Sequence, residues 1–187
     1  MAEKRKNWNG LISGFRASDL VFLDESGCNT DMTRRYAYSL GGSRAVDSAP
    51  LSKPKNTTIL SSIQLDGTLH YTTFSGGTTV ERFKQYLKTD LLPHLNGDSV
   101  LVMDNMKSHH AKAVKNLLDS SGVRYVYLPP YSPDLNPIEK LWSKVKSLLR
   151  KFKARTLDAL PNAIQNAFHS VTVSDCSGWF RFCGYVL

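Results

Sequence analysis

Short runs of apolar residues alternate with amphipathic stretches along this chain, and together they predict an α/β domain. Residues 20–23 and 100–103 are apolar at every position, which is typical of parallel strands that are covered on both faces. Asp24 and Asp104 follow these two runs directly. Polar groups at the carboxyl ends of parallel strands gather at one edge of a sheet, so we expect the two carboxylates to be neighbours there. Strand alternation points Glu25 away from Asp24.

Three more strands are predicted. Residues 57–65 and 68–74 flank Asp66-Gly67, which is a signal for a two-residue hairpin turn. Residues 123–128 form the last predicted strand.

Capping residues and apolar periodicity predict the helices between and after these strands. Thr78 with Glu81 forms a capping-box pattern for a helix that Pro93 ends. Ser108 is the expected N-cap of a helix over residues 109–120, which Gly122 closes. Thr156 is the expected cap of a last helix, whose apolar positions are Leu157, Leu160, Ile164, Ala167 and Phe168.

The segment 128–139 (Leu-Pro-Pro-Tyr-Ser-Pro-Asp-Leu-Asn-Pro-Ile-Glu) joins the last strand to a long helix. Its four prolines fix φ at four places, so the path into the helix is stiff. Asn136 suits the N-cap and Pro137 the first helical position, which puts Glu139 in the first turn. The helix has one apolar face, formed by Ile138, Leu141, Trp142, Val145, Leu148, Leu149 and Phe152.

The order of elements is strand, two-stranded hairpin, helix, strand, helix, strand, helix. This order predicts a ribonuclease H-like (retroviral-integrase-like) mixed sheet flanked by helices. In such a fold Asp24, Asp104 and Glu139 converge at one edge of the sheet.

Composition narrows the class of protein. The 187 residues are 41% hydrophobic and 21% charged, which is typical of one globular domain. The net charge of +8 suits a polyanionic partner. An odd set of cysteines (Cys28, Cys176, Cys183) without a Cys-x-x-Cys pair argues against zinc and disulfides and fits a reducing compartment. No apolar run reaches membrane-spanning length, so no membrane partner is expected.

Two segments show only weak periodicity of apolar residues, so their structure is harder to predict. Residues 1–18 begin with Lys4, Arg5 and Lys6 and are expected to form a basic arm, either mobile or docked as a short lead-in, before a domain over residues 19–187. Residues 28–55 interleave basic and aromatic side chains, including Arg34, Arg35 and Tyr36. That segment could grip a nucleic-acid strand or form a plain surface hairpin.

The motifs around the three carboxylates resemble those of DDE transposases of the mariner superfamily, and most closely those of the bacterial insertion-sequence group numbered six-thirty. The resemblance rests on Phe-Leu-Asp-Glu-Ser-Gly at 22–27, Val-Met-Asp-Asn at 102–105 with His109, and the proline-rich segment 128–139. Thirty-four residues separate Asp104 from Glu139, the spacing of that superfamily. The resemblance runs from about residue 19 to the end of the chain. It implies a domain that cuts and rejoins double-stranded DNA, at transposon ends and at the target, and that works as a homodimer in a synaptic complex.

Elementary chemistry favours the same site. Phosphodiester cleavage needs an activated oxygen nucleophile and a stabilised leaving oxygen, and two Mg²⁺ (or Mn²⁺) ions about 3.5–4 Å apart do both. Asp24 is expected to bridge the ions, with Asp104 on one and Glu139 on the other. Asn105, His109 and Asn136 are expected to support these ligands, His109 by orienting Asp104 or by beginning its helix. Taken singly, Glu139 could be only a capping acid and the aspartates only strand-end residues.

A basic helix follows the proline-rich segment. Residues 140–155 contain seven basic residues and no acid, which favours contacts with DNA phosphates over a solvated helix face. The expected DNA-contacting residues are Lys140, Lys144, Lys146, Arg150, Lys151, Lys153 and Arg155. Helix-turn-helix modules that precede the catalytic domain in full-length relatives are absent from this sequence, so a separate helix-turn-helix chain is a possible partner.

Two other classes of function stay open. A different ribonuclease H-like nuclease, such as a junction resolvase, would use the same carboxylates, and a non-enzymatic DNA-binding relic would keep only the fold. The resemblance implies a bacterial, cytoplasmic and nucleoid-associated protein.

Overall fold

A computed structural model of the chain describes residues 2–34, 36–51 and 54–186. Arg35 and the side chains of Lys4 and Lys6, which belong to the two basic segments above, lie outside the described part. No helix in that part is long and apolar enough to cross a membrane.

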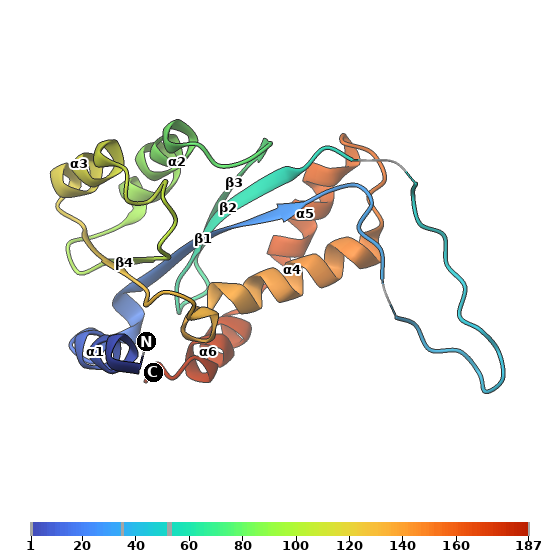
Figure 1. Cartoon of the computed structure of the whole chain (residues 1–187), viewed down its shortest axis with the longest axis horizontal. Helices are drawn as coiled ribbons and strands as arrows, with labels where there is room; N and C mark the ends of the chain where they lie inside the picture. The colour runs from blue at the N-terminus through green and yellow to red at the C-terminus, as the bar shows by residue number, and fades with distance from the viewer. Residues whose placement is uncertain (1, 35, 52–53, 187) are drawn as a thin grey trace.

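Five strands form one mixed sheet in the order β3-β2-β1-β4-β5 (Figure 1). Their bounds are β1 Leu20–Cys28, β2 Thr57–Ile63, β3 Leu69–Ser75, β4 Val100–Met103 and β5 Arg124–Tyr127. The pairs β1–β2 and β2–β3 are antiparallel, whereas β4 and β5 run parallel to β1. This arrangement confirms the predicted mixed α/β sheet and its ribonuclease H-like strand order.

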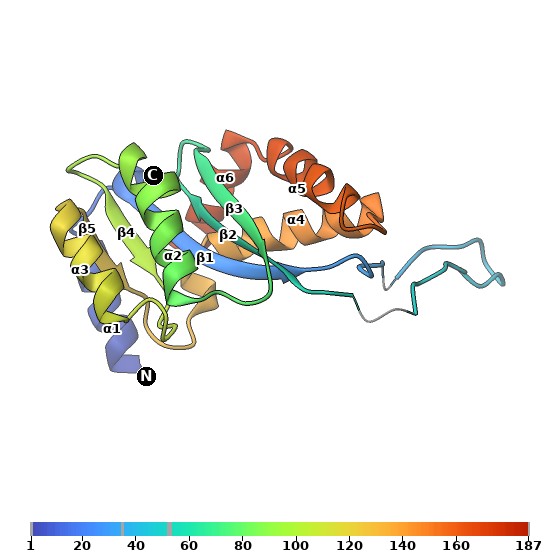
Figure 2. The ribbon, with the colours of Figure 1, turned by 90° about the horizontal axis from the view of Figure 1, so that it is seen from above.

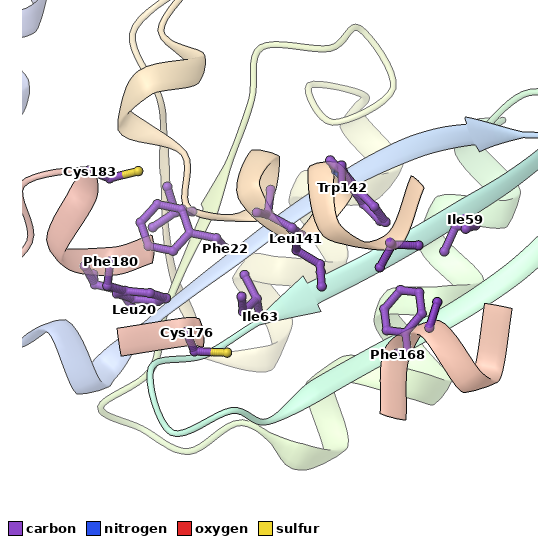
Figure 3. Packing of buried hydrophobic residues seen from close by; sticks show 14 of the residues in the cluster. Leu20, Phe22, Ile59, Ile63, Leu141, Trp142, Phe168, Cys176, Phe180 and Cys183 are labelled. Carbon is purple, nitrogen blue, oxygen red and sulfur yellow. The ribbon is translucent and has the colours of Figure 1, made fainter. Parts of the chain in front are cut away.

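Helices cover both faces of the sheet, as Figure 2 shows. One face holds α2 (Val80–Tyr86) and α3 (Lys112–Ser121), and the other holds α4 (Ile138–Phe152), α5 (Ala159–His169) and α6 (Val173–Phe182). Side chains of strand β1 contribute to the core on both faces of the sheet. Val21 and Leu23 pack towards α2 and α3. Leu20 and Phe22 pack towards the other three helices (Figure 3). Burying both faces of the strand explains why its sequence is apolar at consecutive positions.

The register of β1 corrects one prediction. The strand does not end at Asp24 but continues to Cys28, paired with β2 alone. The parallel ladder between β1 and β4, in contrast, stops at the pair Leu23–Met103. Asp24 and Asp104 are therefore the first residues beyond the ladder on two neighbouring strands.

Several predicted caps and turns differ in detail. The N-cap of α2 is Thr79 rather than Thr78, and helical structure continues through a π-helical turn at Leu87–Leu91. The hairpin loop spans residues 64–68 instead of two residues, since the strand pairing ends at Ile63 and Leu69. Within the loop the amide of Gln64 bonds to the carbonyl of Thr68, and that of Gly67 to the carbonyl of Gln64. The prediction for Gly122 is confirmed, since it closes α3 with a φ of 72°. The Thr156 hydroxyl accepts from the amide of Ala159, but α5 begins only at Ala159, with Asp158 at its N-cap. It is not the last helix as predicted, because α6 follows it.

Helix α3 begins at Lys112, later than predicted, and Ser108 does not cap it. The residues before it form turns in which the amide of His109 bonds to the carbonyl of Met106 and that of Ala111 to the carbonyl of Ser108. At α4, Asn136 is extended and Pro137 is helical, as predicted, but the Asn136 side chain makes no capping bond. The local patterns placed these helices correctly and misassigned their first turns.

The N-terminal segment is docked rather than mobile. It forms α1 (Ala2–Ile12), and Trp8 is only 3% exposed within the same hydrophobic cluster as Tyr185. Near the C-terminus Phe180 and Tyr185 are buried, so the aromatic tail packs on the core, while Phe182 is exposed.

Residues 29–56 leave the sheet as a long excursion (Figures 1 and 2). Its described residues form no strand, so of the two alternatives for this segment the plain surface hairpin is not formed, and contact with nucleic acid stays a prediction. Tyr36, Tyr38 and Leu51 are almost fully exposed there.

Candidate active site

Asp24, Asp104 and Glu139 line one cleft of about 440 Å³ at the edge of the sheet. The remaining walls come from the residues after β4 and from the proline-rich segment: Asn105, Met106, Leu128, Pro129, Pro130, Tyr131, Ser132, Pro133 and Asn136. Three carboxylates that are up to 115 positions apart in the sequence are thus brought together by the sheet register and by the start of α4.

Asp24 is the most buried of the three, at 9% exposed. The indole Nε1 of Trp142, on α4, donates a hydrogen bond to its Oδ2 at 3.1 Å. Burial raises the pKa of Asp24 to about 7, and the negative charges of Asp104 and Glu139 add to this effect against the bonds from Trp142 and the backbone. A carboxylate whose charge is opposed in this way gains from a nearby cation.

Asp104 is held by donors from the loop that follows it. Nδ1 of His109 lies 2.8 Å from its Oδ1, and the amide of Met106 donates to the same oxygen at 3.0 Å. Burial opposes ionisation of Asp104, but these two bonds and the charge of His109 hold its pKa below the usual value.

His109 is fully buried and bridges two acids. Its Nε2 lies 3.5 Å from Oε2 of Glu25, and its ring stacks on Phe83 with centroids 4.2 Å apart. Burial lowers the pKa of His109, but the bonds and charges of Asp104 and Glu25 outweigh it and raise that pKa to about 9. As predicted, Glu25 points to the face opposite Asp24. Its pairing with His109 was not predicted, because the alternation of side chains along β1 indicates only the direction of Glu25 and not its partner.

Glu139 lies on the first turn of α4 and is exposed. The turn before it, Pro133–Leu135, is fastened from both ends of the chain: Arg5 of α1 forms an ion pair with Asp134, and the Tyr185 hydroxyl donates to the carbonyl of Leu135 at 2.6 Å. The position of Glu139 therefore depends on α1 and on the C-terminal tail as well as on the prolines.

The other two predicted supporting residues also lie at the cleft. The Asn105 amide donates to the carbonyl of Leu128, which ties the loop after β4 to the proline-rich segment. Its Oδ1 lies 3.3 Å from His110, which is half-buried and stacked on Tyr127 instead of lying free on the surface. Asn136 also lines the cleft, and its Oδ1 is buried and has no hydrogen-bond partner among the described residues.

The oxygen donors at this cleft fit a divalent cation. As the side chains are placed, no three His, Cys, Asp or Glu residues of the described chain stand close enough together to hold a metal ion. The chemistry of the donors nevertheless suits a divalent cation such as Mg²⁺, since all three acids offer carboxylate oxygen and two of them oppose ionisation of the third.

The seven basic residues around α4 divide into two groups. Four have partners within the protein: Lys140 lies over the Phe182 ring, Lys144 donates to Ser170 and pairs with Asp175, Lys153 pairs with Asp47, and Arg155 donates to the carbonyls of Thr30 and Met32. The second group is Lys146, Arg150 and Lys151. These three residues line pockets between α4 and the segment 29–56.

Comparison with known proteins places this geometry in context. Residues 19–161 match the family model described as DDE superfamily endonuclease. The transposable element Tc1 transposase of Caenorhabditis elegans is 29% identical over 92 residues, which make up 49% of this chain and 34% of that protein.

Solved structures of Mos1 transposase share the fold. Its paired-end complex with the left transposon end matches at a TM-score of 0.80 and 21% identity, over 96% of this chain and 57% of that one. The catalytic domain of Mos1 mariner transposase matches at a TM-score of 0.73 and 17% identity, over 96% and 85% of the two chains. The chain thus spans about a third of the Tc1 protein and somewhat over half of the longer Mos1 chain.

Proposed function

Because this chain belongs to the family of DDE superfamily endonucleases, we propose that it cuts DNA strands and joins them to a target during transposition of an insertion sequence. The observation that carries the proposal is the convergence of Asp24, Asp104 and Glu139 on one cleft. Oxygen-rich clefts of this kind suit metal-assisted phosphoryl transfer.

Two divalent cations, Mg²⁺ or Mn²⁺, are the cofactors of the proposed reaction. Asp24 would contact both, Asp104 one and Glu139 the other, and the bound cations supply Lewis acidity at the nucleophile and at the leaving oxygen. Mos1 structures with Mn and with Mg are among the solved relatives, which supports this choice.

The residues around the acids prepare them for this role. Trp142 fixes the rotamer of Asp24 from α4, whereas His109 and the amide of Met106 fix that of Asp104. Neighbours that hold a ligand carboxylate in this way commonly set metal affinity.

Double-stranded DNA is the proposed partner. Mos1 has been solved as a paired-end complex and as a pre-cleavage transpososome, which supports a homodimer that holds two transposon ends and a target. A separate helix-turn-helix chain could supply recognition of the ends. We place this activity in the bacterial cytoplasm at the nucleoid.

A plasmid-nicking assay tests the proposal. With Mg²⁺ or Mn²⁺ the protein should convert supercoiled DNA to nicked or joined products, and EDTA should stop it. Asp24→Asn, Asp104→Asn and Glu139→Gln should each abolish the activity.

Asp98→Asn is the matched control, because this exposed aspartate precedes β4 at the end opposite Asp104. If a cleft variant cuts as well as Asp98→Asn, the site is misassigned. If the parent binds DNA without cutting it, the protein is a non-catalytic relic, and if it cuts only branched DNA it is a junction nuclease.

A further inference from the structure

Tyr131 combines a strained backbone with an exposed ring at the mouth of the cleft. Its φ is 56°, and Lys153 is the only other non-glycine residue of the described chain with a positive φ. Lys153 has an ordinary reason for this, because it closes helix α4 as its C-cap. Tyr131 closes no helix, and a left-handed backbone conformation is strained at a bulky residue.

Burial of the Tyr131 side chain does not offset this backbone strain. The side chain of Tyr131 is 88% exposed, so its ring gains little from burial. Its neighbours, in contrast, are well held: the Ser132 hydroxyl is buried, accepts from Arg5 at 3.2 Å and faces the carbonyl of Pro130 at 3.4 Å. The backbone is therefore held in a shape that presents the ring to solvent, and glycine or asparagine would adopt that shape at lower cost.

The surroundings of the ring indicate what it could contact. The floor of the same cleft carries the three carboxylates, and its walls carry apolar groups that include Met106, which is 37% exposed, and Pro130. A nucleotide has the matching two parts: a phosphate, which the divalent cations proposed for the three carboxylates would bind, and a flat base, which could lie against the apolar groups. The faces of a base are covered by its neighbours within a duplex, so only an unpaired base could lie on the ring.

We propose that Tyr131 stacks on a base that has left the duplex beside the phosphate in the cleft. This inference rests on the proposed function, because it takes DNA as the ligand of the cleft. Stacking on an aromatic side chain tolerates any base, since every base has a π face. Tyr131 is then a positioning residue that holds a frayed strand and gives no sequence preference.

Binding measurements on two oligonucleotides test this inference. One is a fully paired duplex, and the other is the same duplex with three unpaired nucleotides at one end, both titrated in Ca²⁺ to support binding without cleavage. The parent should bind the frayed duplex more tightly by about 5- to 150-fold, the range expected for stacking of one base. Tyr131→Asn should lose this preference and keep the parent's affinity for the paired duplex, whereas Tyr131→Phe should keep both.

Thermal melting separates this role from a structural one. Because asparagine tolerates a positive φ, Tyr131→Asn should melt no lower than the parent, and Tyr131→Gly should behave likewise. A frayed-end preference that survives in Tyr131→Asn, or that is missing from the parent, overturns the inference. Failure of the parent to bind either duplex would instead count against DNA as the ligand, and so against the proposed function.

Discussion

His109 shows how a single buried residue can govern a site from outside it. The ring lies between Asp104 and Glu25, is 0% exposed, and is pressed against Phe83. The backbone carbonyl of His109 also accepts a hydrogen bond from the Tyr127 hydroxyl at 3.1 Å. The orientation of Asp104 is thus tied to β1, α2 and β5 through one imidazole.

Glu25→Gln should therefore weaken binding of a divalent cation, although Glu25 does not line the cleft. Loss of one acid partner leaves His109 free to turn, and removal of such supporting contacts commonly costs about 10–100-fold in metal affinity. Calorimetric titration of Mn²⁺ into the parent and the variant measures the effect. Glu81→Gln, an exposed acid on α2, is the control, and equal Mn²⁺ affinity in all three proteins would contradict this role for Glu25.

At the scale of elements, α4 supplies a ligand, core side chains and positive charge at once. Its apolar face packs Leu141 against the sheet (Figure 3), together with Val145. Its first turn carries Glu139. The basic residues on its remaining surface do different work, because four of the seven around the helix are engaged within the protein.

Alanine at Lys146, Arg150 and Lys151 together should weaken DNA binding without loss of sequence preference. The slope of log affinity against log salt should fall by roughly 2–3, since each phosphate contact contributes about 0.9. Alanine at Lys144 should act on stability instead, because its ammonium group donates to Ser170 at 2.9 Å and pairs with Asp175. Its melting temperature should drop while the salt slope stays that of the parent; the reverse pattern would show that the helix meets DNA through Lys144.

The elements also show how far sequence reasoning reached. The apolar runs, the proline-rich segment and the spacing from Asp104 to Glu139 were sufficient for the strand order and for the resemblance to DDE transposases. The family match confirms that the chain is a DDE superfamily endonuclease, and the similarity to Tc1 transposase agrees with the mariner type. They also predicted that Asp24, Asp104 and Glu139 would lie together; their roles stay predictions.

What the sequence did not reveal depends on contacts between distant residues. Trp8 is a single apolar position in a polar stretch, and its burial in the cluster that also holds Tyr185 is a long-range contact that helps to dock α1. Ser108 has the local pattern of a cap, but the His109 side chain is occupied by Asp104 and Glu25, and the turn that results delays the helix. Periodicity carries no information about such pairs.

For the whole molecule, Trp8→Ala should be the most revealing change in α1. Removing a large aromatic side chain that is 3% exposed costs about 3–5 kcal/mol. Trp8→Phe should cost less, because most of the apolar volume remains. Chemical denaturation of the two variants and the parent gives the free energies of unfolding. A loss below about 1 kcal/mol for Trp8→Ala would mean that α1 is not packed on the core in solution.

Both end segments of the described chain brace one short turn. Arg5 holds Asp134, and Tyr185 holds Leu135, four residues before Glu139. A purification tag or surface tether joined at either end would therefore pull on these two contacts. It would displace Glu139 before it disturbed the strands of the sheet. Short rigid fusions should distort the cleft in a protein that still melts cooperatively, whereas long glycine-serine spacers should leave it intact.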